Sequence, residues 1–306
     1  MTFADIPEVV VDYVRSVFAI ANDKVSRTLS DHPSMHEEML DQTLLTELVA
    51  APPAFFAKER AAVDIQTHWL GGRHMWGRWE IADIALIVLL RRAGHLEQRK
   101  VALLQTKRLY SKELPVEPLT LDDYVIGIGR LGDRTDPTVP LTRQRAFSFG
   151  DDCVYAAMTA GSDQAKHINA YERDRGIPVF YGFYNPLTLP SRALYPALNG
   201  EPSKSANRLG CRVQTSTHVH GHLGSLTDGI SPTFAGLRDL AIPTTTDPFG
   251  ASGWRLETFV ADEVLRCRQG ALFDSRTDPK LDALFYGRGA PISAAIAITI
   301  DIGGVD

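Results

Sequence analysis

The sequence predicts an α/β protein with a central mixed sheet flanked by helices. Three observations predict it: an amphipathic pattern near the start of the chain, three strand-like segments in close succession, and a later helical pattern followed by an apolar strand. The 306 residues are enough for one large domain or two ordinary ones, and a hydrophobic content of 44% is that of a globular protein.

Charge and cysteine usage narrow the class of protein. The formal net charge of -5 argues against a general nucleic-acid coat protein, while it leaves room for an enzyme with a local basic groove. The three cysteines, Cys153, Cys211 and Cys267, are far apart and form no CxxC pair, which fits a reducing compartment. The first residues carry acids rather than a signal-peptide pattern, and no run is apolar enough to span a bilayer. We expect a cytoplasmic protein with no membrane partner.

Two helices are expected first. Residues 6–29 carry apolar side chains at helical spacing, and a second helix is expected from Ser34 to just before Pro52. Ser34 and Glu37 have the spacing of a capping box, in which the serine caps the helix. The buried stripe of this second helix is expected to be Leu40, Leu44, Leu45 and Leu48. Glu37 projects near the middle of that stripe, and Glu38 lies at its edge.

The strands follow in order. Residues 61–70, 79–92 and 100–110 are strand-like and joined by short links, as in an antiparallel meander. Residues 112–160 are rich in proline, glycine and charge, which indicates an insertion. A helix over 162–175, ended by Gly176, precedes the aromatic strand IPVFYGFYNP. In the C-terminal part we expect strands at CRVQTSTHVHGH and PISAAIAITIDI and a helix over 254–270.

Polar residues interrupt the apolar pattern of the second and third expected strands, at Asp83 in the second and at Gln105 and Lys107 in the third. Because side chains alternate along a strand, Gln105 and Lys107 share one face of the third strand. If the two strands pair, Asp83 stands next to both residues, and the helix that carries Glu37 can add a second carboxylate. Asp83, the Gln105 amide oxygen and the Thr106 carbonyl are hard oxygen ligands that suit Mg²⁺. Lys107 can then hold a water or stabilise a charged transition state.

This order of elements resembles the PD-(D/E)xK nuclease superfamily over roughly residues 31–190. The matching features are a helix with an acid, Asp83 on the second strand, and Gln105-Thr106-Lys107 as a QxK form of the ExK motif. The chain is similar to the restriction-endonuclease-like members with Gln in that position, which include nuclease effectors of bacterial antiphage defence. The resemblance implies an N-terminal helix in 1–30, a nuclease core over 31–190 with an insertion at about 112–160, and a mixed α/β extension over 191–306.

The resemblance also implies an activity. It implies Mg²⁺- or Mn²⁺-dependent endonuclease cleavage of double-stranded DNA, with Asp83 and Gln105 as metal ligands and Lys107 as the catalytic lysine. Either Glu37 or Glu38 would be the helix acid. Because Gln105 replaces a carboxylate, an acid must compensate for the lost charge. The resemblance to such effectors also implies that a partner protein, a signal molecule or homo-oligomerisation restrains the nuclease activity.

Phosphate contacts require local positive charge. Basic residues gather between the end of the second strand and the insertion, and among them Arg92, Arg108 and Lys112 are the residues that we expect to contact DNA.

Other interpretations remain open. His218, His220 and His222 would point to one side of a strand, which is a metal-ligand spacing and would suit a metal hydrolase of another class. A non-catalytic subunit that keeps the nuclease fold for binding is a third possibility, because Gln105 stands where an acid is usual. In purely structural terms, Asp83 can pair with Arg78 or Arg108, and Gln105 and Lys107 can form the solvated end of an edge strand.

Overall fold

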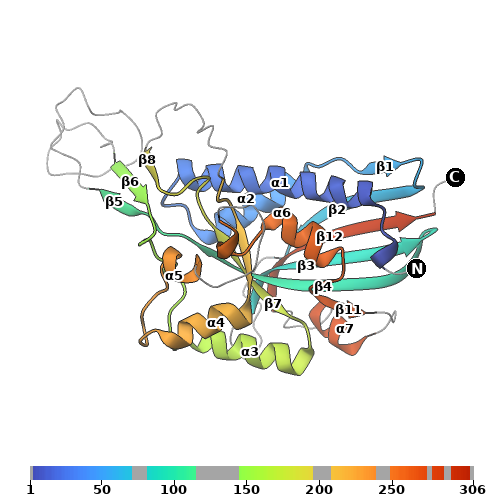
Figure 1. Ribbon diagram of the computed structural model, residues 1–306. Coiled ribbons are helices and arrows are strands. Elements are labelled where there is room, and N and C mark those ends of the chain that lie inside the picture. Colours follow the sequence, from blue (N-terminus) through green and yellow to red (C-terminus); the bar gives the residue numbers. More distant parts are fainter. Residues whose placement is uncertain are drawn as a thin grey trace.

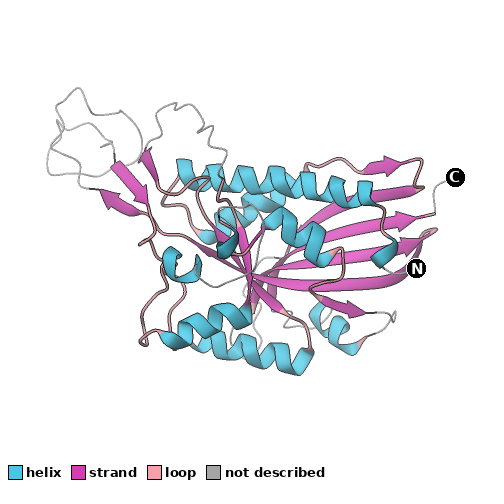
Figure 2. Ribbon diagram, viewed as in Figure 1, coloured by secondary structure: helices cyan, strands magenta, loops and turns pink. Residues whose placement is uncertain are grey.

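The computed structural model describes residues 3–70, 81–114, 145–195, 208–238, 249–273, 278–285 and 291–303. It is an α/β protein in which a large mixed sheet carries helices on both faces, as the sequence predicts (Figure 1). Helices α1 (Glu8–Asp31) and α2 (Glu37–Val49) lie on one face, and α3 (Asp163–Arg175) and α4 (Ser216–Ser225) lie on the other (Figure 2).

The central sheet has nine strands within the described residues, in the order β1-β2-β12-β3-β4-β7-β9-β10, with β11 paired to β4. Their bounds are β1 Ala54–Phe56, β2 Ala61–Trp69, β3 Ala82–Arg92, β4 His95–Arg108, β7 Val179–Tyr184, β9 Arg212–Thr215, β10 Trp254–Arg255, β11 Ala271–Phe273 and β12 Ile292–Ile302. A smaller sheet joins β5 (Lys112–Leu114), β6 (Arg145–Phe149) and β8 (Ser191–Tyr195).

One of the two strand pairings in the predicted antiparallel meander is present. Strands β3 and β4 pair antiparallel, with Ile84 opposite Leu104. Strands β2 and β3 are not neighbours, because β12 lies between them, antiparallel to β2 and parallel to β3. The burial pattern of β12 fits this interior position: alternate residues from Ile292 to Ile300 are fully buried, and the residues between them are buried or partly buried. The link over 71–80, including Arg78, lies outside the described residues.

The crossover from β4 to β7 agrees with the sequence. Helix α3 begins after Ser162 and ends at Gly176, whose φ of 67° is the left-handed conformation that glycine adopts without strain. Strand β7 then pairs parallel to β4, with Tyr181 opposite Gln105, and all its side chains are buried. This β-α-β unit places the end of β4 in the interior of the sheet.

Helix α2 begins later than its capping pattern predicts. Its N-cap is His36, which makes no side-chain cap, so the prediction of Ser34 as the cap is wrong. The chain turns just before the helix, where Met35 N donates to the His32 carbonyl, and the helix cannot extend back through that turn. As a consequence Glu37 stands in the first helical turn. The predicted leucine stripe is buried as expected: Leu40, Leu44, Leu45 and Leu48.

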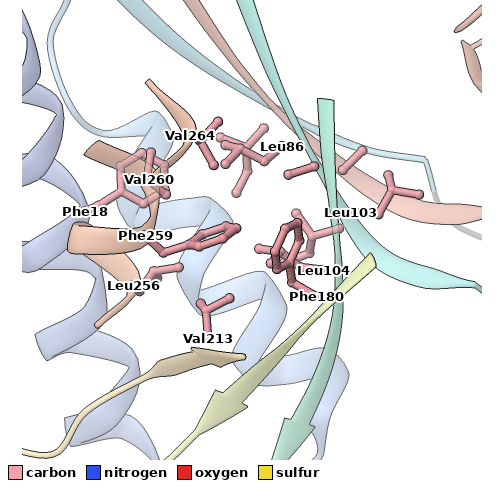
Figure 3. Packing of buried hydrophobic residues seen from close by; sticks show 14 of the residues in the cluster. Phe18, Leu86, Leu103, Leu104, Phe180, Val213, Leu256, Phe259, Val260 and Val264 are labelled. Atoms are coloured by element: carbon pink, nitrogen blue, oxygen red, sulfur yellow. The ribbon is translucent and has the colours of Figure 1, made fainter. Parts of the chain in front are cut away.

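The C-terminal part contributes to both the sheet and the core. The predicted helix over 254–270 is shorter: the strand β10 precedes α6 (Leu256–Thr258), which continues as a π-helix, η5, over Phe259–Val264. Phe259 packs against Phe180, with ring centroids 4.7 Å apart, at the centre of the hydrophobic cluster (Figure 3). This contact joins the C-terminal segment to β7.

Short elements complete the chain. They are η1 (Phe3–Asp5), α5 (Phe234–Arg238), η4 (Gly250–Ser252) and α7 (Pro279–Phe285). Among the described helices, none combines the length and the apolar character needed to cross a bilayer.

Candidate functional site

The C-terminal end of β4 brings Asp83 and Gln105 together. Asp83 Oδ2 accepts hydrogen bonds from Gln105 Nε2 at 2.6 Å, from the Thr106 backbone N–H at 2.6 Å and from Thr106 Oγ1 at 2.9 Å. The antiparallel register explains this contact, since Ile84 opposite Leu104 sets Asp83 opposite Gln105. Gln105 and Thr106 are both 2% exposed, so the carboxylate is held at the edge of a dry interior.

A second carboxylate, Asp41, reaches the same hydroxyl from helix α2. Thr106 Oγ1 lies 3.1 Å from Asp41 Oδ2, and Tyr184 donates its hydroxyl to Asp41 Oδ1 at 2.5 Å. The sequence reasoning missed Asp41. A signal was present, because Asp41 lies four residues before Leu45 and seven before Leu48, inside the buried stripe. An acid on an apolar helix face is seldom buried without a partner.

Asp41 and Asp83 compete for the hydrogen of a single hydroxyl group, that of Thr106. The Thr106 hydroxyl carries one hydrogen and can donate it to either Asp41 or Asp83, not to both. Burial raises the pKa of Asp41 well above its usual value, and the nearby Asp83 raises it further, against the opposing hydrogen bonds from Tyr184 and Thr106. A proton or a cation bound between these groups would therefore reduce the repulsion between them.

Lys107 is paired with the other predicted acid. Its Nζ lies 3.6 Å from Glu37 Oε2, and Glu37 Oε1 accepts the backbone N–H of Arg108 at 3.0 Å. Both oxygens of Glu37 are thus engaged, and the carboxylate holds the lysine rather than joining Asp83. Glu38 is exposed. The helix carboxylate that the structure brings to Asp83 is therefore Asp41, and not Glu37 or Glu38.

The donor set suits a hard divalent cation. Gln105 Oε1 is buried and accepts no hydrogen bond from the described residues. Within those residues no three His, Cys, Asp or Glu side chains are arranged to hold a metal ion. The available oxygens are those of Asp41, Asp83 and Gln105, with the amide rotated so that its oxygen replaces its NH₂ group. Two carboxylates and one amide oxygen fit Mg²⁺, which retains several waters in protein sites.

The predicted phosphate-binding residues are not grouped at this site. Arg108 is buried, donates to the Pro33 carbonyl at 2.7 Å and stacks 3.6 Å from the centroid of the Tyr110 ring. Arg92 stands at the opposite end of β3 from Asp83, roughly 30 Å away along the strand. Lys112 is exposed and pairs with Asp152. Of the three, Lys112 alone is both exposed and close in the chain to Lys107.

The histidine cluster does not form on a strand. The strand β9 ends at Thr215, whose hydroxyl caps helix α4, and the prediction that the three histidines share one strand face is wrong. His218 Nδ1 lies 2.9 Å from Thr215 Oγ1. His220 lies between Tyr181 and Asn169, with Nε2 2.9 Å from the Tyr181 hydroxyl and Nδ1 2.8 Å from Asn169 Oδ1. Both nitrogens of His220 are therefore occupied by protein groups.

The stability of the protein is expected to depend on the protonation of His220. Burial lowers the pKa of His220 to about 4, whereas an unfolded histidine titrates near about 6.5. Between these values the unfolded chain binds the extra proton, so the free energy of unfolding decreases as the pH falls through this window, by at most roughly 1.4 kcal/mol per pH unit. Urea unfolding across this window should show a flatter dependence for His220→Gln. The exposed neighbour His218 provides the control, since His218→Gln should keep the wild-type slope; an unchanged slope in His220→Gln would contradict the expectation.

The arrangement as a whole has a definite chemical capacity. It holds the buried carboxylate of Asp41 and the partly buried carboxylate of Asp83, the Gln105 amide beside Asp83, and the ammonium group of Lys107 held by Glu37. With a divalent cation bound between the carboxylates, such a set would offset the charge of an anionic substrate and orient a water against it. No protein-family model, no curated protein and no solved structure matches the chain.

Proposed function

We propose that the protein is a metal-dependent endonuclease of the PD-(D/E)xK, restriction-endonuclease-like type that cleaves DNA. The observation that carries the proposal is the end of β4, where Gln105 and Thr106 contact Asp83 while α2 supplies two further carboxylates. The order α2-β3-β4-α3-β7, with β7 parallel to β4, supports it. The inserted β12 between β2 and β3 departs from a simple meander.

In this proposal Asp83, Asp41 and the Gln105 oxygen hold Mg²⁺ or Mn²⁺. The bound metal would supply an activated water and offset charge on the phosphodiester. Asp41 restores the negative charge that Gln105 lacks relative to a carboxylate. Lys107, held by Glu37, keeps an ammonium group beside the acidic pair, where it can orient the attacking water or stabilise charge on the substrate.

The proposed biological role rests on the same resemblance to PD-(D/E)xK nucleases. We propose double-stranded DNA as substrate and a role as a nuclease effector in bacterial antiphage defence, acting in the cytoplasm. Its activity would be restrained by a partner protein, a signal molecule or homo-oligomerisation. Lys112, exposed near the end of β4, is the described residue best placed along the chain to contact a phosphate.

The test is cleavage of plasmid and linear duplex DNA with Mg²⁺, Mn²⁺ or a chelator, together with calorimetric titration of Mn²⁺. Lys107→Met should lower cleavage by about 100-fold or more, the usual size of such a contribution. Glu37→Gln should lower it by about 10- to 100-fold by releasing the lysine.

Matched controls are available at exposed positions. Lys58→Met and Glu38→Gln replace exposed residues and should leave cleavage unchanged. A wild-type protein that neither binds Mn²⁺ nor cuts DNA would overturn the proposal.

The second candidate is a non-catalytic subunit with the same fold. It is favoured by the Gln105 amide, which donates to Asp83 and so satisfies that carboxylate without a metal. A protein that binds duplex DNA in a gel-shift assay, but neither binds Mn²⁺ nor cleaves, would identify this candidate.

A further inference from the structure

The hydroxyl group of Tyr184 is buried against a carboxylate of the candidate site. Tyr184 is 2% exposed and Asp41 is 4% exposed, and the tyrosine donates a hydrogen bond to Asp41 Oδ1 at 2.5 Å. A buried phenolic hydroxyl usually finds a hydrogen-bond partner, and a carboxylate is a strong acceptor. This contact therefore fixes the place of one of the two Asp41 oxygens.

The central sheet holds the tyrosine in position. Tyr184 is the last residue of β7, where it pairs parallel with Arg108 at the end of β4. Its carbonyl accepts the backbone N–H of Leu109 at 2.9 Å, so the pairing continues through this residue. Thr106 lies two residues before Arg108 and on the same face of β4, because side chains alternate along a strand. The Tyr184 and Thr106 hydroxyls thus approach Asp41 from two neighbouring strands.

The two oxygens of Asp41 have different surroundings as a result. Oδ1 accepts the hydrogen bond from Tyr184. Oδ2 lies 3.1 Å from Thr106 Oγ1, and the same hydroxyl oxygen lies 2.9 Å from Asp83 Oδ2. Oδ2 is therefore the Asp41 oxygen on the side of Asp83. While the tyrosine keeps its hydrogen bond, Asp41 would offer one oxygen rather than two to a cation held between the carboxylates.

We propose that Tyr184 is a positioning residue that makes the site select Mg²⁺ or Mn²⁺ over Ca²⁺. Calcium takes six to eight oxygen ligands and often uses both oxygens of one carboxylate. Magnesium is smaller, keeps several waters and takes few carboxylate oxygens, and manganese also suits a site of carboxylates and water. By holding Oδ1, Tyr184 limits Asp41 to the binding mode that the smaller ions require. This inference rests on the proposed metal site.

The experiment is calorimetric titration of the whole protein with Mn²⁺ and, separately, with Ca²⁺. The wild type should bind Mn²⁺ more tightly than Ca²⁺. Tyr184→Phe keeps the ring and removes the hydroxyl, so Asp41 is free to turn both oxygens toward a cation. The ratio of the Ca²⁺ to the Mn²⁺ dissociation constant should fall by about 10-fold or more, the usual size of the effect when a group that orients a metal ligand is lost.

Tyr155→Phe is the matched control. Tyr155 is also 2% exposed, and its hydroxyl donates to Asn185 Oδ1 at 2.7 Å, so the same atom and one buried hydrogen bond are removed. This variant should keep the wild-type ratio of dissociation constants, because neither Tyr155 nor Asn185 contacts the carboxylates of the site in the described part of the chain. Thermal unfolding of each protein shows that the comparison is made between folded chains.

Three results would overturn the inference. One is a wild type that binds Ca²⁺ as tightly as Mn²⁺, which requires no variant and no assumption about folding. Another is a folded Tyr184→Phe protein with the wild-type ratio, and the third is an equal change of the ratio in Tyr155→Phe. A wild type that binds neither ion contradicts the proposed metal site itself, so the two failures are distinguishable.

Discussion

Asp83→Asn is expected to lower Mg²⁺-dependent DNA cleavage by at least about 100-fold, because it removes a charged oxygen from the proposed metal site. The same change should leave the metal-free protein at least as stable, since it relieves the repulsion between Asp83 and the buried Asp41. Cleavage rates and thermal unfolding midpoints, each measured with and without Mg²⁺, check both parts.

The control for this variant is Asp64→Asn. Asp64 lies on the strand β2, where its carboxylate accepts a hydrogen bond from the exposed Gln66 at 2.7 Å. The Asp64→Asn variant should cleave DNA as fast as the wild type, and Mg²⁺ should stabilise both proteins to the same degree. If Asp83→Asn retains full cleavage, or gains as much thermal stability from Mg²⁺ as the wild type does, then Asp83 holds no metal.

Phe259→Ala is expected to destabilise the fold by about 3–5 kcal/mol, the usual cost of removing a large buried side chain. Phe259 is fully buried and its ring packs 4.7 Å from Phe180 and 5.9 Å from Trp254, measured between centroids. The cavity would open between the π-helix and β7 (Figure 3). Chemical denaturation should show a lower midpoint with an unchanged slope.

Phe55→Ala is the matched control for the same chemical change. Phe55 lies on the edge strand β1 and is 53% exposed, so its loss should change the free energy of unfolding by less than about 1 kcal/mol. Equal losses in the two variants would show that the C-terminal segment is not part of the cooperative core.

Local patterns predicted the elements that depend on local interactions. The end of the α3 helix follows from Gly176, and the leucine stripe of α2 follows from its period. The position of β12 was not predictable in this way, because its neighbours are more than 200 residues away in sequence, and periodicity carries no information about such pairing. The histidines were misplaced for a local reason, since the Thr215 cap starts a helix where the alternation indicates a strand.

The candidate site likewise contains one contact that the sequence predicts and one that it does not. The contact between Asp83 and Gln105 follows from strand alternation and a short link, and both are visible in the sequence. The approach of Asp41 depends on how α2 packs over β4 and β7, which brings its carboxylate to Thr106 and Tyr184. That packing is tertiary, and the helical wheel alone could not distinguish Asp41 from Glu37 or Glu38 as the acid nearest to Asp83.

The central position of β12 has a consequence for biosynthesis. Strands β2 and β3 can emerge from the ribosome early, but the strand that joins them is translated about 200 residues later. Until then each presents an unpaired edge, and Asp83 stands on a strand with one neighbour missing. Nascent chains that end before residue 302 should therefore depend on chaperones. The proposed nuclease activity would begin only after residues 292–302, which form β12, have been synthesised.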